Sequence, residues 1–196
     1  FLAALAAGAT ISQPAECAFN TDAGTTDFNA DKLTPVTNVD WCDAYAFCAW
    51  AGKRLCGKIG GGPLTTTSIG DPSMSEWMRA CTIAPDGGTQ IYPYGDTPSA
   101  TACNGAELDA GKVAEIASLP ACVGGAPGVF DMSGNVDEWD NGCDHATGSG
   151  DCCDTRGGGF HDFETACGIG DVLPANCAGR TRGETHSDVG IRCCSD

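Results

Sequence analysis

The cysteines are the residues of this sequence with the clearest chemistry. The chain of 196 residues contains 14 of them, and thiols can form disulfides, hold a metal ion or act as nucleophiles. No C-x-x-C pair occurs anywhere, and the adjacent pairs Cys152-Cys153 and Cys193-Cys194 suit a tetrahedral zinc cage poorly. An even count at this density is typical of a chain that is oxidised outside the cytoplasm. We therefore expect disulfides to be the main use of the cysteines.

The other side chains form no familiar catalytic pattern. The three histidines, His145, His161 and His186, are best interpreted as solvated polar residues of loops. The glycine run 60–62 lacks the lysine and hydroxyl of a phosphate-binding loop, and the stretch GNVDEW is not a nucleophile elbow. By themselves, these residues predict covalent cross-linking rather than an active site.

Charge and length limit the classes of function. The chain has 10 basic and 26 acidic side chains, which gives a formal net charge of −16. So acidic a surface repels nucleic-acid phosphates and anionic lipid headgroups, whereas it attracts cations such as metal ions. No apolar run approaches the roughly 20 residues that span a bilayer. A chain of this size with 42% hydrophobic residues is expected to form a single domain over residues 1–196.

The first residues, FLAALAAGA, have two interpretations. An apolar segment followed by small residues resembles the end of a secretory signal peptide, but the basic segment that normally precedes it is missing. The alternative is the last part of a helix that begins further upstream and stops at Gly8. We favour the helix, and we expect the domain to be truncated at its N-terminus.

Two short helices are expected in the first half of the chain. In the segment 38–54, Asp40 can cap the amides of the run WCDAYAFCAW, and Gly52 can take the left-handed conformation that ends a helix. The second helix is expected to open with a capping box from Ser73 to Glu76 and to continue over 77–81. The connection between the two helices is predicted to be an irregular loop because glycine and threonine dominate it.

Strands are expected to be short in the second half of the chain. Glycine and proline interrupt the sequence every few residues from position 84 onward. The candidate strands, each flanked by turn residues, are 90–92, 128–130, 157–160 and 190–192. Two helices followed by a loop-dominated half predict an α+β domain with low regular secondary structure. Disulfides can support such a chain, since each contributes about 2 to 4 kcal/mol by constraining the unfolded state.

Several sequence blocks follow the order seen in one known family. They are PVTNVDWCDAYAFCAWAGKRL, EWMRAC, YPYG, CNG, GVFDMSGNVDEW, RGGGF, CAGR and VGIRCC, within residues 35–196. In these blocks the sequence resembles the formylglycine-generating enzyme family, also called the sulfatase-modifying-factor domain, which is related in fold to C-type lectins. The resemblance implies mostly irregular backbone, two helices and a small twisted antiparallel sheet. The segment between Leu55 and Glu76 is longer than the family's connection.

The resemblance also implies two disulfides. Cys48 of the first helix would pair with Cys193, and Cys81 of the second helix would pair with Cys177 of the CAGR block. Both bonds would join the two halves of the chain and close long loops, for which the entropic contribution is large. The partners of the remaining cysteines stay open.

Calcium is the cofactor that the resemblance implies. GVFDMSGNVDEW resembles the family's calcium loop, whose ligands fall on the side chains of Asp131 and Glu138 and on the carbonyls of Gly134 and Val136. A hard divalent cation takes roughly six to eight oxygen ligands, and such a turn supplies most of them. The other interpretation is that both carboxylates only cap turns.

A second family calcium site would use the Asn104 side chain and the Gly105 carbonyl. Its remaining ligands fall in a loop that this sequence shortens, where Asp109 is the one plausible carboxylate. For this second site, calcium binding and a purely structural role of these residues are equally good interpretations.

The oxidase centre of the family is incomplete in this sequence. The enzymes oxidise a substrate cysteine to formylglycine with two cysteines that bind copper(I), a soft ion that readily takes two thiolates. The matching positions here are Asp162 and Cys167, and the serine of the family's GGS triplet is Gly159. We therefore expect that oxidase activity is absent, that copper is not bound and that Cys167 is available for a structural disulfide. The iron-dependent sulfoxide synthases, a second group of relatives, need three histidines in a helical domain that is missing here.

We expect a secreted or cell-surface domain, held by disulfides and calcium, that acts as a binding or structural module. Its interaction surface would be the one where the enzymes hold their substrate peptide, around Phe160, Asp162 and Phe163. Core packing is an equally good interpretation of the two phenylalanines. The partner would be a protein, a peptide or a glycan. Two alternatives stay open, an oxidase that relies on Cys167 and a subunit of an extracellular assembly or filament.

Overall fold

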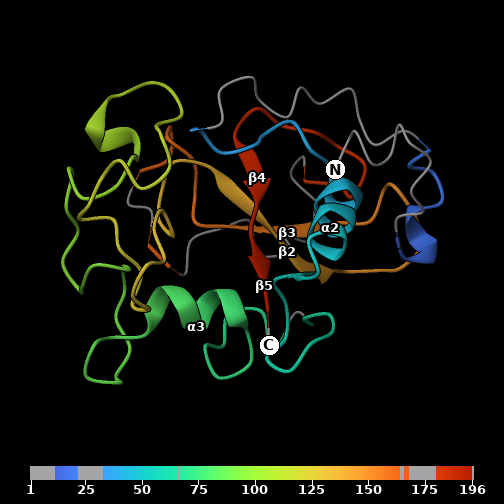
Figure 1. Cartoon of the computed structure of the whole chain (residues 1–196), viewed down its shortest axis with the longest axis horizontal. Coiled ribbons are helices and arrows are strands. Elements are labelled where there is room, and N and C mark those ends of the chain that lie inside the picture. The colour runs from blue at the N-terminus through green and yellow to red at the C-terminus, as the bar shows by residue number, and fades with distance from the viewer. Residues whose placement is uncertain (1–11, 22–32, 66, 164–165, 168–179, 196) are drawn as a thin grey trace.

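Short helices and strands joined by long irregular segments make up the chain (Figure 1). The computed structural model describes residues 12–21, 33–65, 67–163, 166–167 and 180–195, so the helix expected at the start of the chain lies outside the described residues. The described elements are η1 Ala15–Cys17, α2 Trp41–Trp50, β1 Arg54–Leu55, α3 Glu76–Thr82, η2 Ala106–Leu108, β2 Asp137–Cys143, β3 Cys153–Arg156, β4 Val189–Ile191 and β5 Cys193–Cys194. The predicted α+β class with low regular structure is confirmed.

Helix α2 has the caps that the sequence predicts. The carboxylate of Asp40 accepts a hydrogen bond of 2.7 Å from the backbone N–H of Asp43, and Gly52 lies just beyond the helix with φ of 70°. Trp41 fixes the helix to the sheet, because its indole N–H donates to the Asp140 carbonyl of β2 at 2.9 Å. Local sequence therefore sets the ends of α2, and a buried aromatic contact sets its place.

Helix α3 begins later than its predicted capping box. Its N-cap is Ser75 rather than Ser73, and the Ser75 hydroxyl accepts a hydrogen bond of 3.2 Å from the Met78 N–H. The carboxylate of Glu76, which the box would have turned back to the helix start, binds both terminal nitrogens of Arg54 instead. The predicted box was wrong because a two-point bond to a guanidinium is stronger than a bond to one backbone amide.

The central sheet is mixed, which corrects the expectation of an antiparallel sheet. β2 lies in the middle, pairs antiparallel with β3 and pairs parallel with β4. β1 and β5 form a separate antiparallel pair. A parallel neighbour needs a long connection instead of a hairpin, and the chain between β3 and β4 supplies one.

Of the four predicted strands, only 190–192 overlaps a strand, β4. The candidate 157–160 follows β3, which ends at Arg156 because Gly157 and Gly158 take φ of 96° and 70°. In place of the candidates 90–92 and 128–130, the structure has isolated bridges, from Tyr92 to Gly95 and from Val123 to Phe130. Side chains and turns, rather than long ladders, hold these parts of the chain.

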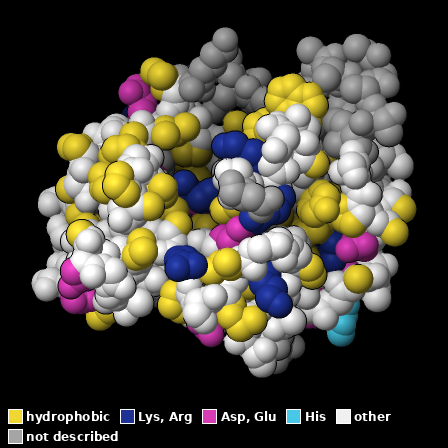
Figure 2. Space-filling view, turned by 60° about the horizontal axis from the view of Figure 1, so that its bottom comes forward, with side chains coloured by type: hydrophobic (Ala, Val, Ile, Leu, Met, Phe, Trp, Pro, Cys, Tyr) yellow, Lys and Arg dark blue, Asp and Glu magenta, His cyan; other side chains and the backbone are white. Residues whose placement is uncertain are grey.

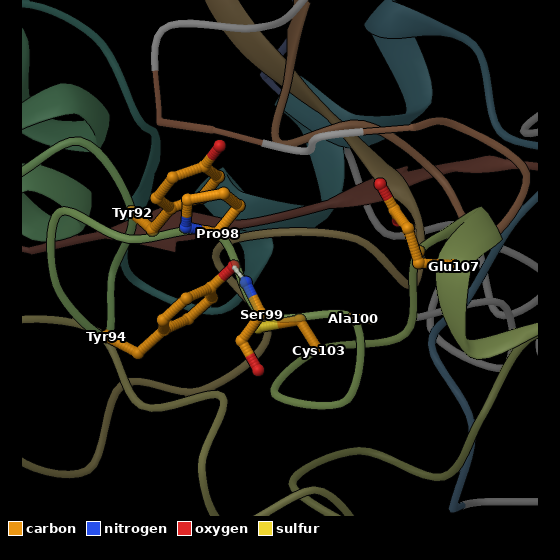
Figure 3. A pocket seen from close by; sticks show the side chains of 8 residues that line it. Tyr92, Tyr94, Pro98, Ser99, Ala100, Cys103 and Glu107 are labelled. Carbon is orange, nitrogen blue, oxygen red and sulfur yellow. Dashed lines mark hydrogen bonds between the residues drawn. The ribbon is translucent and has the colours of Figure 1, made fainter.

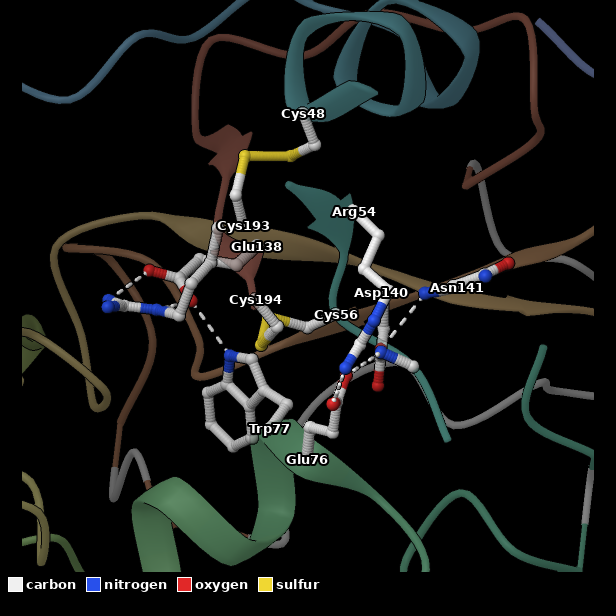
Figure 4. The surroundings of a disulfide bond; sticks show 12 residues. Cys48, Arg54, Cys56, Glu76, Trp77, Glu138, Asp140, Asn141, Cys193 and Cys194 are labelled. Atoms are coloured by element: carbon white, nitrogen blue, oxygen red, sulfur yellow. Dashed lines mark hydrogen bonds and ion pairs between the residues drawn. A yellow bond between two sulfur atoms is a disulfide. The ribbon is translucent and has the colours of Figure 1, made fainter. Parts of the chain in front are cut away.

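Disulfides connect the elements throughout the described part of the chain. The bonded pairs are Cys17–Cys42, Cys48–Cys193, Cys56–Cys194, Cys81–Cys167, Cys103–Cys122 and Cys143–Cys153. Cys152 is disulfide-bonded as well, and no described cysteine is free. The bonds from Cys48 and Cys56 hold the two neighbouring residues of β5 (Figure 4).

One of the two disulfides implied by the resemblance is present, and the other needs correction. Cys48 is bonded to Cys193, as implied. Cys81 is bonded to Cys167 rather than to Cys177, which lies outside the described residues. The reason is local, since the Cys167 N–H donates to the Ile91 carbonyl at 2.9 Å and this bond brings Cys167 near the end of α3.

Two clusters of buried side chains form the core. The first lies between α2 and the sheet and includes Trp41, Leu55 and Trp139. The second surrounds α3 and includes Trp77 and Met132. Because the neighbouring cysteines of β5 pack one against each cluster, this short strand joins the two parts of the core.

The long segment between β1 and α3 covers the outer side of β2 and β3. Leu64 forms a parallel bridge with Gly142 of β2, and the guanidinium of Arg156 in β3 donates to the Ile69 carbonyl. The Arg156 Nε lies 3.5 Å from the carboxylate of Asp140, and both side chains are fully buried. This segment thus helps to cover a buried charged cluster.

The surface is not uniformly acidic despite the net charge of −16. On the face shown in Figure 2, basic side chains gather around a central hollow, and acidic side chains are spread around it. Among the helices that the structure describes, none has the length and apolar character needed to cross a membrane.

Candidate functional site

The turn after β3 carries the positions that match the oxidase centre of the family. The Gly158 N–H donates to the carboxylate of Asp137 at 3.0 Å. The Phe160 N–H donates to the Asn135 carbonyl at the same distance. Both acceptors lie at the beginning of β2 or directly before it, so the turn is fixed to the centre of the sheet.

Asp162 is held in this turn through both its side chain and its backbone carbonyl. Its carboxylate accepts a hydrogen bond of 2.6 Å from the Gly159 N–H, and its carbonyl accepts one of 2.9 Å from the Ala106 N–H. The ring of His161 lies beside the same carboxylate, with Nε2 at 3.8 Å. A hard, hydrogen-bonded oxygen group therefore occupies the position where the enzymes carry a thiolate.

Cys167 offers no thiolate either. It is buried and bonded to Cys81 of α3. A sulfur atom in a disulfide is not a thiolate, and the thiolate is the form that binds metals and attacks substrates. The pair of Asp162 and Cys167 therefore does not fit copper(I).

The residues of the predicted binding surface lie on the outside of the turn. Phe163 is 72% exposed, so core packing does not explain it. Phe160 is partly buried, and its ring meets the His161 ring edge-on with the centroids 5.1 Å apart. The Asp162 side chain is 39% exposed. Of these three residues, Phe163 and Asp162 are thus accessible to a partner, and Phe160 is partly so.

An ion-pair network lies behind the turn. Arg180 donates to the carboxylates of Asp137 and Asp188 at 3.1 and 3.0 Å. The Nε2 atom of His161 lies 3.5 Å from the same carboxylate of Asp188. These contacts link β2, the turn and the residue before β4, which keeps the surface in place.

Asp131 is the first of the four predicted calcium ligands. Its carboxylate accepts a hydrogen bond of 2.8 Å from the Ala117 N–H. Burial raises the pKa of the Asp131 carboxyl, the Ala117 N–H and Arg192 lower it, and Glu138 raises it further. Two carboxylates thus share one guanidinium, and a bound cation would compensate the remaining negative charge.

Glu138 is already bound by protein groups (Figure 4). Its two oxygens accept hydrogen bonds of 2.5 Å from Arg192, and the Trp77 indole N–H donates to it at 2.7 Å. A carboxylate has about four lone-pair positions, so little capacity remains for a metal. A calcium ion would therefore rely on Asp131 and on the carbonyls of Gly134 and Val136. Within the described ranges no group of three His, Cys, Asp or Glu side chains could hold a metal ion.

Asn104 carries the best evidence for a second cation site. Its amide nitrogen donates to the Lys112 carbonyl at 3.0 Å and to the Asn135 side-chain oxygen at 3.1 Å. Its own side-chain oxygen is buried, and no described residue forms a hydrogen bond with it. Gly105 precedes η2, and Asp109 ends it in a left-handed conformation with φ of 53°. An orphaned buried oxygen fits a cation ligand, because an unmade hydrogen bond in the interior is costly.

A pocket that the sequence did not predict lies beside the turn (Figure 3). Its volume is about 260 Å³, and its lining residues are Tyr92, Tyr94, Pro98, Ser99, Ala100, Cys103, Gly105 and Glu107. The only sequence signal was the block YPYG, which places two aromatic residues on a tight turn.

The family model described as "Sulfatase-modifying factor enzyme 1-like domain" matches residues 3–196. The chain is 29% identical over 169 residues to the inactive C-alpha-formylglycine-generating enzyme 2 of Bos taurus, covering 82% of this chain and 50% of that protein. It is 28% identical over 191 residues to the formylglycine-generating enzyme of Thermomonospora curvata, with coverages of 83% and 55%. It is 33% identical over 106 residues to the hercynine oxygenase of Mycolicibacterium thermoresistibile, with coverages of 54% and 20%. The chain thus spans about half of these relatives or less.

Solved structures share the fold at low sequence identity. CarF superposes with a TM-score of 0.56 at 23% identity, covering 98% of this chain and 79% of CarF. PvdO from Pseudomonas aeruginosa superposes with a TM-score of 0.54 at 18% identity, with coverages of 97% and 73%. At these identities the likeness shows the fold alone.

Proposed function

We propose that this chain, which belongs to the sulfatase-modifying factor enzyme 1-like domain family, has no oxidase activity and acts as a binding or structural domain. One observation carries the proposal: Cys167 is bonded to Cys81, and Asp162 stands where the family enzymes have the other copper-binding cysteine. The chemistry of the family enzymes needs two thiolates at these positions, and neither position supplies one.

The relatives by themselves do not decide between the two functions. The Bos taurus protein is named inactive, whereas the Thermomonospora curvata protein of nearly the same identity is named as an enzyme. The state of the two site residues therefore carries more weight than overall similarity. An oxidase that relies on Cys167 is the alternative that the experiment must exclude.

The disulfides support placement in an oxidising compartment, on the cell surface or in a secreted protein. Such bonds persist outside the reducing cytosol, and they join distant parts of this chain, including Cys56 with Cys194 at a separation of 138 residues. A chain with so little regular structure depends on these bonds for its stability. The ligand of the binding domain would be a protein, a peptide or a glycan.

Calcium would stabilise the loops on which the binding surface rests. In this proposal Asp131 and the carbonyls of Gly134 and Val136 hold the first ion, and Asn104 with Gly105 holds a second. Asn135 lies between Gly134 and Val136 in the sequence and contacts the second site as well. It accepts a hydrogen bond from Asn104 and donates one to the Ala114 carbonyl at 3.3 Å. An ion at either position would therefore stiffen the same part of the fold.

A combined measurement of thiols, copper and turnover tests the loss of activity. The protein unfolded in denaturant without reductant should release no titratable thiol, should not retain copper(I) against a chelator and should not convert a cysteine-bearing peptide to the aldehyde. The formylglycine-generating enzyme of Thermomonospora curvata, assayed in parallel, is the positive control. Titration of Cys167 as a free thiol, or formation of aldehyde by this chain, would refute the proposal.

A further inference from the structure

The pocket of Figure 3 has one aromatic wall and one acidic wall. Tyr92 and Tyr94 stack with their ring centroids 5.2 Å apart and form the aromatic wall together with Pro98. Glu107 of η2 stands on the other side, and it is the one charged residue of the lining. The disulfide of Cys103 with Cys122 anchors the base of the pocket.

The aromatic wall is held in a fixed shape. Tyr92 and Gly95 exchange two backbone hydrogen bonds, of 2.8 and 3.2 Å. The carboxylate of Asp96 accepts a bond of 3.0 Å from the Ile91 N–H and closes the same turn. The Tyr94 hydroxyl accepts a bond of 3.3 Å from the Ser99 N–H across the pocket (Figure 3). Little ordering would therefore be required when a ligand binds.

Glu107 acts electrostatically on the aromatic wall. Burial raises the pKa of the Tyr94 phenol, the Ser99 N–H lowers it, and electrostatic interactions with Tyr92 and Glu107 raise it again. The Glu107 carboxylate is thus close enough to influence the phenol. A positive charge placed between the two walls would interact with the carboxylate and with the electron-rich ring faces together.

Both walls are bonded to the turn that replaced the oxidase centre. The Cys167 N–H donates to the Ile91 carbonyl, directly before the tyrosines, and the Ala106 N–H donates to the Asp162 carbonyl, directly before Glu107. The pocket therefore lies next to the turn that presents Phe163. A partner that covers this surface would also reach the pocket.

We propose that this pocket receives the cationic side chain of a lysine or arginine from a protein partner. The volume of about 260 Å³ lies below the roughly 300 to 1,000 Å³ of pockets for drug-sized ligands, so the pocket has room for one long side chain. An anion would meet Glu107 and a net charge of −16. A neutral side chain would make no charge-assisted contact with the Glu107 carboxylate. The inference rests on the proposed binding role and names the chemistry of the partner.

Titration of the intact protein with capped peptides tests this site. The probe is acetyl-Gly-Ala-Lys-Ala-Gly-amide, and the comparison peptide carries norleucine, which has the same chain length without the charge. Amide resonances of Ser99 and Ala106 report binding at the two walls by NMR. The lysine peptide should shift both resonances in a saturable way, and the norleucine peptide should bind about tenfold more weakly, since a charge-assisted contact is lost.

Matched variants distinguish binding in the pocket from attraction by the net negative charge of the chain. Glu107→Gln should weaken binding of the lysine peptide about tenfold, whereas Glu115→Gln, at an exposed position outside the lining, removes the same charge and should leave binding unchanged. Tyr94→Leu should weaken it about threefold by removing a ring face.

Four results would overturn the proposal. The first is the absence of any shift at Ser99 and Ala106, and the second is equal binding of both peptides. The third is an equal effect of the two glutamate variants. The fourth is binding of free butylamine as tight as that of the lysine peptide, which would indicate a small amine as the ligand. None of them changes the thiol, copper or turnover measurements, so failure of the pocket is distinguishable from failure of the proposed function.

Discussion

Replacement of Asp140 by asparagine should remove a pH dependence that is built into the core. Asp140 and Asp154 both face Arg156, at 3.5 and 4.0 Å, and all three side chains have no exposure. One guanidinium cannot neutralise two carboxylates. Burial therefore raises the pKa of Asp140 from its ordinary value of 3.8 to about 7, while Arg156 opposes the rise and Asp154 adds to it.

The sign and size of the effect follow from this shift. The folded state holds the Asp140 proton more tightly than the unfolded state does, so the free energy of unfolding falls as the pH rises from about 4 to about 7. A displacement of roughly three pKa units corresponds to about 4 kcal/mol. The contribution of Asp140 is thus most favourable at acidic pH, in contrast to the usual salt-bridged carboxylate.

Urea unfolding of the oxidised protein at a series of pH values measures this dependence. From pH 5, which lies within the expected transition, to pH 8, which lies about one unit above it, the wild type should lose stability relative to Asp140→Asn. Asp154→Asn should also flatten the profile, because it removes the like charge that helps to raise the pKa of Asp140. Asp86→Asn, at an exposed position, is the control and should keep the wild-type slope. Identical slopes for the wild type and Asp140→Asn would refute the reasoning.

Three further predictions concern the disulfide, the exposed surface and the metal. Cys81→Ser combined with Cys167→Ser should lower the free energy of unfolding by about 4 kcal/mol, measured by urea titration, since the bond spans 86 residues; a loss below about 1 kcal/mol would mean that the bond is not structural. Phe163→Ala should change the stability by less than about 0.5 kcal/mol in the same assay because the ring is exposed, and a larger loss would place the ring in the core. Calcium should raise the melting temperature of the wild type in calorimetry but not that of Asp131→Asn, and an equal rise in both would exclude Asp131 as a ligand.

Local features of the fold were predictable from the sequence, and pairings between distant residues were not. The Asp40 cap and the Gly52 stop of α2 depend on a few neighbouring residues, and both are present. The family blocks placed Cys48 opposite Cys193 correctly. The pairing of Cys81 failed because the position of Cys167 is set by a backbone bond to Ile91, a contact that no sequence pattern announces.

The acidic residues of β2 show the same limit. Asp137, Glu138 and Asp140 are all buried, although the sequence indicated a role only for Glu138, as a calcium ligand or a turn cap. β2 is covered on one side by α2 and on the other by the long segment before α3, so carboxylates from both faces become buried. Each is therefore paired with an arginine from a distant part of the chain, namely Arg180, Arg192 and Arg156 in the same order. Without the fold, these three pairs cannot be deduced.

The disulfide at Cys167 supports the proposed binding role over oxidation. A catalytic thiol must be exposed to its substrate and free to react, whereas the sulfur of Cys167 is buried against α3. The same bond, together with the capping of Gly159 by Asp162, fixes the turn that presents Phe163. The substitution at Asp162 and the disulfide of Cys167, which together remove the reactive pair, are thus the features that give the surface a defined shape. A turn that is held by bonds within the chain suits recognition of a partner, because the cost of ordering it is met when the chain folds.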